Sequence, residues 1–126
     1  MKEIKLAIAI PTNIKLHQKS SILEIEFDDG QHFELSCEYL RTHSPSAEVQ
    51  GHGPGQEVLQ VGKEDVNITA IEPVGNYAVV LVFDDNHRSG IYSWDHLYNL
   101  GINKEANWLR YLERLKEAGL KRKAVE

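Results

Sequence analysis

The side chains best suited to chemistry lie in two short stretches of the sequence. One stretch contributes Arg41, His43, Ser44, Ser46, Glu48 and His52, and the other contributes Asp85 and His87. Imidazoles combined with a carboxylate could hold a divalent transition ion. The same residue types could instead anchor a loop, with hydroxyls and carboxylates bonded to backbone groups. We expect this second role and no bound metal, with His43 and His87 as the weak candidates for metal ligands.

No catalytic motif accompanies these residues. Ser44 and Ser46 are not in a Gly-x-Ser-x-Gly elbow, and no oxyanion-hole motif is present. The glycine-rich stretch 51–55 lacks the lysine and hydroxyl residue of a phosphate-binding loop. The single cysteine, Cys37, allows no internal disulfide, which fits a reducing compartment. We therefore expect a protein of the cytoplasm that is not an enzyme.

Length and charge restrict the partners. The chain has 126 residues, with 14 basic and 19 acidic side chains and a net charge of −5. This length predicts one domain, residues 1–126. The negative charge argues against bulk attraction to nucleic acid or anionic membranes, and the apolar run 6–10 is too short to span a bilayer. The expected partner is therefore another protein.

Apolar patterns predict a β-rich domain with short helices. Strands are expected at 14–17, 22–27, 32–35, 66–71, 77–83 and 89–92, and helices at 37–42, 94–99 and 104–118. The density of glycine, proline and serine predicts that 43–62 is a long loop without regular structure. The last helix carries an apolar stripe at Trp108, Tyr111, Leu112 and Leu115. We expect this stripe to pack on the sheet, with a partner-binding helix as the alternative.

Two segments of the chain resemble each other. The first runs from Leu23 to Leu40 and the second from Val79 to Leu97. Each contains a strand that ends in Phe-Asp-Asp, a return strand, and a serine before a short helix. We interpret them as two copies of a ββα unit that bury their apolar faces together; chance recurrence of common turn sequences is the alternative. The predicted fold class is therefore α+β, with two ββα-like repeats and a C-terminal helix packed on the sheet.

These motifs resemble a known family. The residues that carry the resemblance are Phe27-Asp28-Asp29-Gly30, Glu38-Tyr39-Leu40-Arg41, and the segments 83–87 and 93–97. They are similar to the N-terminal domain of γ-butyrobetaine hydroxylases, which also occurs alone in bacteria as a family of unknown function and attached to Mrp-type iron–sulfur-carrier ATPases. The resemblance covers residues 11–101, and 102–126 follow as a helix and basic tail. It implies no oxygenase activity, because the hydroxylase site belongs to a separate domain, and it associates the chain with iron–sulfur or cofactor-dependent oxidoreductase pathways.

The resemblance also implies a small zinc module in the hydroxylases. The family's histidine ligand matches His87, and its three cysteine ligands fall at Ser44, Ser46 and Val49. Structural zinc takes four nitrogen or sulfur ligands, usually with thiolates. Because all three thiolates are replaced, we expect this degenerate site to hold no zinc and the chain to need no cofactor.

The leading hypothesis is a non-enzymatic adaptor that binds a protein partner. Its surface is expected to combine the loop 41–56 with the turn and helix 84–98, including Trp94 and Tyr98, because arginine and aromatic side chains are frequent interface anchors. The loop 43–52 should then lie against the turn 84–88. The alternative is a metal- or small-molecule-binding module at the histidine cluster, and an enzyme is the least supported hypothesis.

Overall fold

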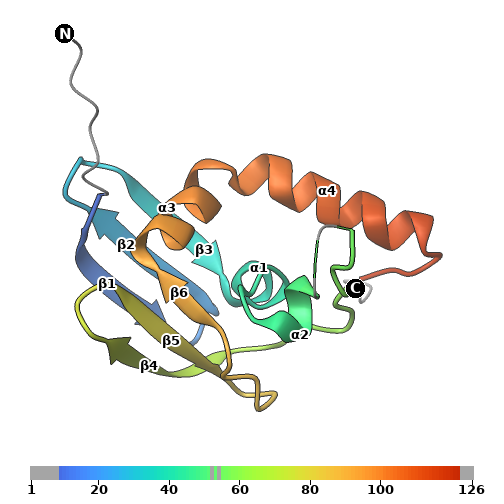
Figure 1. Cartoon of the computed structure of the whole chain (residues 1–126), viewed down its shortest axis with the longest axis horizontal. Coiled ribbons are helices and arrows are strands. Elements are labelled where there is room, and N and C mark those ends of the chain that lie inside the picture. Colours follow the sequence, from blue (N-terminus) through green and yellow to red (C-terminus); the bar gives the residue numbers. More distant parts are fainter. Residues whose placement is uncertain (1–8, 52, 54, 123–126) are drawn as a thin grey trace, which may run out of the picture.

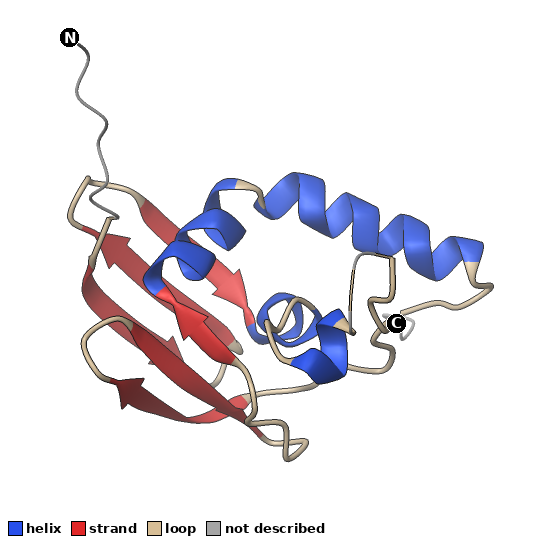
Figure 2. Cartoon of the chain, in the orientation of Figure 1, coloured by secondary structure: helices blue, strands red, loops and turns tan. Residues whose placement is uncertain are grey.

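Two three-stranded antiparallel sheets form the frame of the structure, a computed structural model that describes residues 9–51, 53 and 55–122. The first sheet has the order β1 (Pro11–His17), β2 (Ile22–Phe27) and β3 (His32–Ser36), and the second has the order β4 (Ile68–Val74), β5 (Ala78–Phe83) and β6 (Ile91–Ser93). Helix α1 (Cys37–Thr42) follows the first sheet, and α3 (Trp94–Ile102) follows the second. The remaining helices are α2 (Ala47–Gln50) and α4 (Lys104–Glu117) (Figures 1 and 2).

The hairpin turns of the two sheets have the same construction. In the first, the Gly30 N–H donates to the Phe27 carbonyl at 3.0 Å, and in the second the Asn86 N–H donates to the Phe83 carbonyl at 3.1 Å. Gly30 has a φ of +91° and Asn86 a φ of +70°. Glycine and asparagine are the residues that enter this left-handed region most readily. The predicted repeat is thus a structural repeat, and the two sequences differ at the turn without changing its geometry.

The helix that follows each sheet begins at a serine cap, as predicted. The Ser36 hydroxyl accepts a hydrogen bond from the Tyr39 N–H at 3.0 Å, and the Ser93 hydroxyl accepts one from the His96 N–H at 3.1 Å. Each cap satisfies a backbone donor that the first helical turn leaves unpaired. Because each cap is the last residue of its strand, α1 and α3 leave β3 and β6 with no intervening loop.

Both repeats contribute to one hydrophobic core. Period-two alternation in β2 buries Leu23, Ile25 and Phe27 while Glu24 and Glu26 face outward. The second sheet adds Ile68, Leu81 and Phe83 to the same cluster, and the helices add Leu40 and Leu97. Each such side chain contributes about 1.5–3 kcal/mol when it is fully buried. Neither sheet covers its own apolar face, so the two stabilise each other.

Two tyrosines join the repeats with reciprocal hydrogen bonds. The Tyr39 hydroxyl, on α1, donates to the Leu100 carbonyl of α3 at 2.6 Å. The Tyr92 hydroxyl, on β6, donates to the Leu40 carbonyl of α1 at 2.6 Å. Both bonds are buried, and each satisfies a carbonyl near the end of the other repeat's helix. They set the position of α1 relative to α3.

Helix α4 packs on the body of the domain through its apolar stripe. Trp108 lies edge-on to Tyr39 of α1 at 6.4 Å between ring centroids, and the Tyr111 hydroxyl donates to the Gln60 carbonyl at 2.7 Å. At the start of the helix, the Lys104 ammonium donates to the Glu34 carbonyl of β3 at 3.1 Å. The helix therefore contacts α1, the segment 57–60 and the edge strand β3. No helix in the described part of the chain has the length and apolar character to cross a membrane.

The segment 43–62 departs from its prediction as a loop without regular structure. It contains the four-residue helix α2, which begins after Ser46, whose hydroxyl accepts a hydrogen bond from the Glu48 N–H at 3.2 Å. Val49 of α2 is buried, and its carbonyl accepts a hydrogen bond from the Val58 N–H at 2.8 Å. The serine cap and one buried valine are therefore enough to order a helical turn between the proline- and glycine-rich stretches.

Candidate functional site

The loop and the turn that the sequence analysis singled out meet in the interior. The Ser44 hydroxyl lies 2.9 Å from Nε2 of His87, and both side chains are buried. Two effects hold the pKa of His87 below its usual range. The larger is burial of the ring, and the smaller is the positive charge of Arg41. The imidazole is therefore neutral at neutral pH and pins the loop to the turn.

A second layer of hydrogen bonds continues from this pair toward the surface. The Ser46 hydroxyl lies 2.7 Å from the Ser89 hydroxyl, which donates to the Glu48 carboxylate at 2.8 Å. That hydrogen bond lowers the pKa of Glu48. The other oxygen of Glu48 is 3.5 Å from Nδ1 of His87, which has no hydrogen-bond partner among the described residues. The described part of the loop, 43–51, thus lies against the turn 84–88 and Ser89 through side-chain contacts.

These residues do not fit a structural zinc ion. The histidine nitrogen Nε2 of His87 is occupied by the Ser44 hydroxyl, and serine is a poor zinc ligand near neutral pH. Val49 is buried but offers no ligand atom. Among the described residues, neither His43 nor His87 belongs to a group of three or more clustered metal-ligating side chains. Ser44, Ser46 and His87 form a hydrogen-bonded anchor at these positions.

The same residues do not form a working hydrolase triad. Ser44, His87 and Glu48 lie in the order nucleophile, base and carboxylate, but Ser44 is 0% exposed. A Cβ placed on Gly90 would lie 2.4 Å from the Ser44 hydroxyl, so this hydroxyl is closely packed. A nucleophile must be reachable by the atom that it attacks. No substrate carbonyl can reach Ser44 in this arrangement.

Arg41 is also an interior residue, and it is held by an ion pair. Its Nε donates to the Asp85 carboxylate at 2.8 Å, and the Lys63 ammonium donates to the same oxygen at 2.7 Å. Burial alone would raise the pKa of Asp85, but hydrogen bonds from Lys63 and Arg41 lower it to about 2. The ion pair between Arg41 and Asp85 therefore helps to hold the turn 84–88 in place.

His43 points away from this interior cluster and into a separate pocket. Its Nδ1 lies 3.0 Å from the Tyr39 carbonyl and 3.0 Å from the Thr42 hydroxyl. Its ring lies 6.0 Å from the Tyr111 ring of α4. Burial, with a contribution from the positive charge of Arg114, lowers the pKa of His43, so the imidazole is neutral at neutral pH. His43 and His87 therefore face different surroundings and share no ligand.

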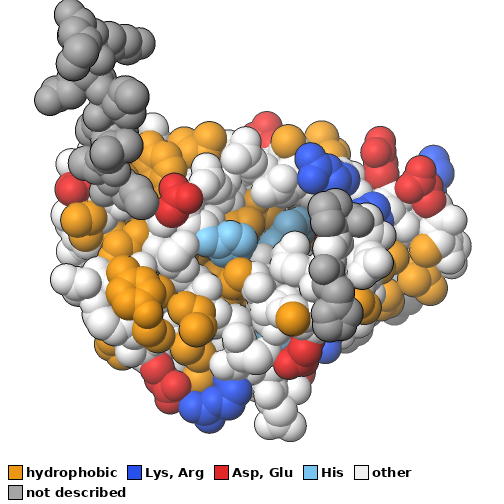
Figure 3. All heavy atoms as spheres, in the orientation of Figure 1, with side chains coloured by type: hydrophobic (Ala, Val, Ile, Leu, Met, Phe, Trp, Pro, Cys, Tyr) orange, Lys and Arg blue, Asp and Glu red, His pale blue; other side chains and the backbone are white. Residues whose placement is uncertain are grey.

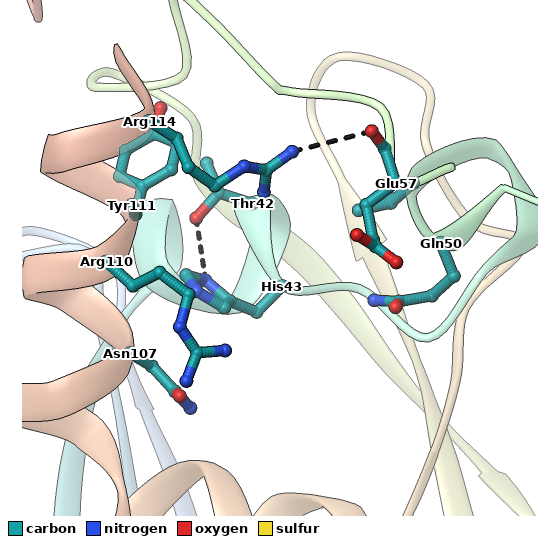
Figure 4. A pocket seen from close by; sticks show the side chains of 9 residues that line it. Thr42, His43, Gln50, Glu57, Asn107, Arg110, Tyr111 and Arg114 are labelled. Atoms are coloured by element: carbon teal, nitrogen blue, oxygen red, sulfur yellow. Dashed lines mark hydrogen bonds between the residues drawn. The ribbon is translucent and has the colours of Figure 1, made fainter. Parts of the chain in front are cut away.

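The pocket lies between α4 and the α1–α2 connection and has a volume of about 330 Å³. It is lined by Thr42, His43, Val49, Gln50, Glu57, Asn107, Arg110, Tyr111 and Arg114. Figure 4 shows Asn107, Arg110 and Arg114 projecting from α4 toward Gln50 and Glu57 on the opposite wall. Figure 3 shows histidine side chains near the centre of this face of the molecule and basic side chains above and to the right of them.

The two arginines of the pocket have few partners. The Arg114 guanidinium donates one hydrogen bond of 3.4 Å to the Glu57 carbonyl. The Arg110 side chain makes no hydrogen bond or ion pair with any residue that the structure describes. One carboxylate, that of Glu57, lines the pocket, and it accepts a hydrogen bond from the Gly55 N–H at 3.0 Å. The pocket therefore presents two guanidinium groups, one helical turn apart, to a single carboxylate.

The two aromatic residues predicted for the binding surface lie elsewhere. The Trp94 indole N–H donates to the Asn76 carbonyl at 2.8 Å. The Tyr98 hydroxyl donates to Asp29 at 2.6 Å, and its ring packs edge-on against Phe27 at 5.1 Å. Both residues stabilise α3 on the sheets. His52 lies outside the described residues.

Sequence reasoning overlooked the arginines of α4. The prediction for the last helix used only its apolar stripe, to which Arg110 and Arg114 do not belong. Their spacing of i and i+4, with Asn107 three residues earlier, places all three on neighbouring positions of one face. This spacing was the available signal. It could not reveal the opposite wall, which comes from residues 42–57.

The fold and the interior cluster define a class of protein. It is an α+β domain made from a duplicated sheet-and-helix unit, with a serine–histidine anchor between the repeats. The family model described as "Gamma-butyrobetaine hydroxylase-like, N-terminal" matches residues 14–98, and the chain belongs to this family. The resemblance noted from the sequence is thereby confirmed. None of the curated proteins compared with the chain matches it.

Three solved structures are similar to the chain. One, an NMR solution structure, is 50% identical, covers 100% of this chain and 98% of its own, and has a TM-score of 0.79. A second NMR structure is 45% identical, covers 95% of this chain and 94% of its own, and has a TM-score of 0.80. A crystal structure from Acidithiobacillus ferrooxidans is 34% identical over 72% of this chain and 91% of its own, with a TM-score of 0.61. It is described as a protein of unknown function of the DUF971 family.

Proposed function

We propose that the chain is a non-enzymatic interaction domain that recognises an acidic group of a protein partner. The observation that carries this proposal is the pair of arginines in the pocket between α4 and the α1–α2 connection. Arg110 and Arg114 face one acidic side chain, Glu57, and neither forms an ion pair with a described residue. An incoming carboxylate would supply the missing charge.

The chemistry of the lining favours a carboxylate. A guanidinium group donates two parallel hydrogen bonds to a carboxylate, which gives both strength and direction. The Asn107 side chain adds a polar group beside the arginines, and its amide nitrogen donates to the Tyr39 hydroxyl at 3.1 Å. Neutral His43 offers a polar ring without a competing charge. Together these groups favour a planar, singly charged anion.

The dimensions of the pocket favour a side chain of a protein over a larger free ligand. A volume of about 330 Å³ is at the lower end of small-molecule sites. The wall that contains Glu57 continues into Val58 and Val61, whose side chains are exposed. A peptide that places a glutamate or aspartate in the pocket could cover these valines with its neighbouring residues. This arrangement supports the adaptor hypothesis. In this form of the hypothesis the binding surface is centred on α4 rather than on Trp94 and Arg41.

The test is a binding measurement with defined peptides. A blocked hexapeptide that contains one glutamate, its glutamine counterpart, succinate and inorganic phosphate are each titrated into the protein. Binding is followed by amide and arginine Nε–H chemical shifts. We expect the glutamate peptide to shift the signals of Asn107, Arg110 and Arg114, and the glutamine peptide to have no effect.

Matched variants identify the groups responsible. Hydrogen bonds to charged groups contribute about 1.5–3 kcal/mol, so Arg110→Gln or Arg114→Gln should each weaken peptide binding by about 10-fold or more. Arg88→Gln is the control, because Arg88 forms an ion pair with Glu72 on the second sheet. Equal binding by the glutamine peptide, or a preference for phosphate over all carboxylates, would refute the proposal.

A further inference from the structure

The outer face of the first sheet gathers imidazoles and carboxylates outside the site described above. In β2 the buried positions alternate with outward ones, so Glu24 faces solvent. The register places Glu24 opposite Glu34 of β3 and opposite Lys15 of β1. His17 of β1 and His32 of β3 occupy diagonal positions on the same face. Three strands therefore deliver these side chains to one small area.

Glu24 connects the two histidines. One of its oxygens lies 2.8 Å from Nε2 of His17, and the other lies 2.6 Å from Nε2 of His32. Glu24, His32 and Glu34 each offer a ligand atom, and these atoms all lie within 4.8 Å of one another. The side chains of His17 and His32 are 46% and 43% exposed. An ion could therefore reach the cluster from solvent.

We propose that Glu24, His32 and Glu34 form a binding site for a divalent transition ion of the zinc type, and that His17, which bonds the other oxygen of Glu24, orients this carboxylate. Imidazole nitrogen and carboxylate oxygen are the ligands that such ions accept together, whereas magnesium and calcium prefer oxygen alone. This site is independent of the carboxylate pocket on α4.

The present distances are close to those that coordination requires. Zinc bonds of 2.0–2.2 Å at a tetrahedral angle separate two ligand atoms by about 3.3 Å. The nitrogen–oxygen distance of 2.6 Å between His32 and Glu24 must therefore lengthen by about 0.7 Å. The Glu34 oxygen, which lies within 4.8 Å of both ligand atoms, must adjust as well. Side chains on paired strands can make this adjustment without moving the backbone. The ion would replace the proton that now joins Glu24 to His32.

Other charged groups on this face determine whether its net charge attracts a cation. Lys15, opposite Glu24, opposes a cation, whereas Glu24, Glu34 and neighbouring Glu26 attract one. The only cysteine, Cys37, is 0% exposed and does not compete for the metal. Lys104, whose ammonium donates to the Glu34 carbonyl, also opposes the ion, but the three carboxylates outnumber the two lysines, so the local charge favours the ion.

The experiment titrates zinc chloride into the full chain, produced without a histidine tag, by calorimetry and by NMR of the imidazole nitrogens. We expect one equivalent of zinc per chain and shifts at His17 and His32, with His43, His87 and His96 unaffected. Magnesium chloride should produce no shift.

Variants distinguish a metal site from a hydrogen-bonded network. Loss of a group that merely supports a ligand weakens metal binding by about 10- to 100-fold, so His32→Gln and Glu24→Gln should each weaken zinc binding by about 10-fold or more. Both positions are on the sheet surface, and the amide spectrum verifies that each variant is folded. Glu72→Gln, on the second sheet, is the control and should bind as the parent does. Absence of zinc binding at millimolar concentration, or unchanged binding by His32→Gln, would overturn the proposal.

Discussion

The Ser44 hydroxyl lies 2.9 Å from Nε2 of His87, and this contact joins two segments that are 43 residues apart. The resemblance to hydroxylase domains implies a thiolate and a zinc ion at this place. In this chain a hydrogen bond between neutral groups joins the two segments. It holds the described part of the loop, 43–51, on the second hairpin, and His43 and Gln50 of that loop line the pocket beside α4.

Ser44→Ala should destabilise the domain. The substitution leaves both nitrogens of the buried His87 ring without a partner, because Nδ1 already lacks one among the described residues. An unsatisfied buried group costs about 1–3 kcal/mol. Urea unfolding at neutral pH measures the loss. Ser20→Ala is the control, since the exposed Ser20 hydroxyl makes one long bond of 3.5 Å, and equal stability of the two variants would contradict the assigned role of Ser44.

Restoring thiolates should create a zinc site at the same place. The variant that combines Ser44→Cys, Ser46→Cys and Val49→Cys supplies three sulfur ligands to join His87, which is a complete set for structural zinc. We expect one additional zinc per chain after exposure to a weak chelator, measured by elemental analysis against the parent protein. Addition of His87→Ala should abolish the gain. Zinc content that does not depend on His87 would show that the thiolates bind metal in another arrangement.

Gly101→Ala should also destabilise the fold, by overpacking. A Cβ at this position of α3 would lie 2.4–2.7 Å from atoms of the Phe33 ring, which packs against Phe27 and Tyr98. Overpacking in a filled interior costs about 1–3 kcal/mol. Thermal and urea unfolding give the value. Gly53→Ala, where a Cβ meets nothing within 4 Å, should leave stability nearly unchanged.

Stability should fall as the pH decreases below about 6.5. Burial lowers the pKa of His43, His87 and His96 in the folded protein, so the unfolded chain binds protons more readily in this range. Their contribution is complete above about pH 6.5 and is lost as the pH falls toward the folded pKa values. His32 has the opposite effect on the pH dependence of stability, because the hydrogen bond to Glu24 raises the pKa of His32.

Urea unfolding between about pH 5 and pH 8 measures this dependence, in the range where histidines titrate. The free energy of unfolding should decrease toward pH 5, because the lowered pKa values of buried His87 and half-buried His43 and His96 outweigh the raised pKa of His32. His96→Asn should reduce the slope, since the half-buried ring of His96 is removed. A stability that rises toward pH 5 would contradict the pKa directions of the buried residues.

Local patterns of the sequence predicted most of the elements. The strand 22–27 and the helix 37–42 have the predicted bounds, because period-two alternation and the Ser36 cap act over a few neighbouring residues. The bounds of the elements in the second repeat differ more from their predicted bounds. Strand β4 begins at Ile68 rather than at residue 66 and continues through Pro73 to Val74. The strand was predicted to end at residue 71, but Pro73 lies within β4, which is an edge strand and therefore a place where proline is tolerated.

The candidate site depended on contacts that local patterns do not contain. Arg41, Ser44 and His87 were predicted to lie on a binding surface, but the structure buries all three. Their residue types are usually exposed, and only the closure of the loop over the second hairpin encloses them. The two arginines of the pocket could not be singled out for the opposite reason, since the packing of α4 leaves them without an ion pair to any residue that the structure describes.

The sequence by itself determined the duplicated unit, the Phe-Asp-Asp turns, the serine caps and the absence of zinc thiolates, because each depends on residue type and short spacing. Only the tertiary structure decided which of the polar residues are interior anchors and which line a pocket. It also brought His17, Glu24 and His32 together across three strands. The physical reason is that burial and the convergence of side chains depend on how α4, the loop 43–62 and the two sheets pack, and the residues involved are up to tens of positions apart.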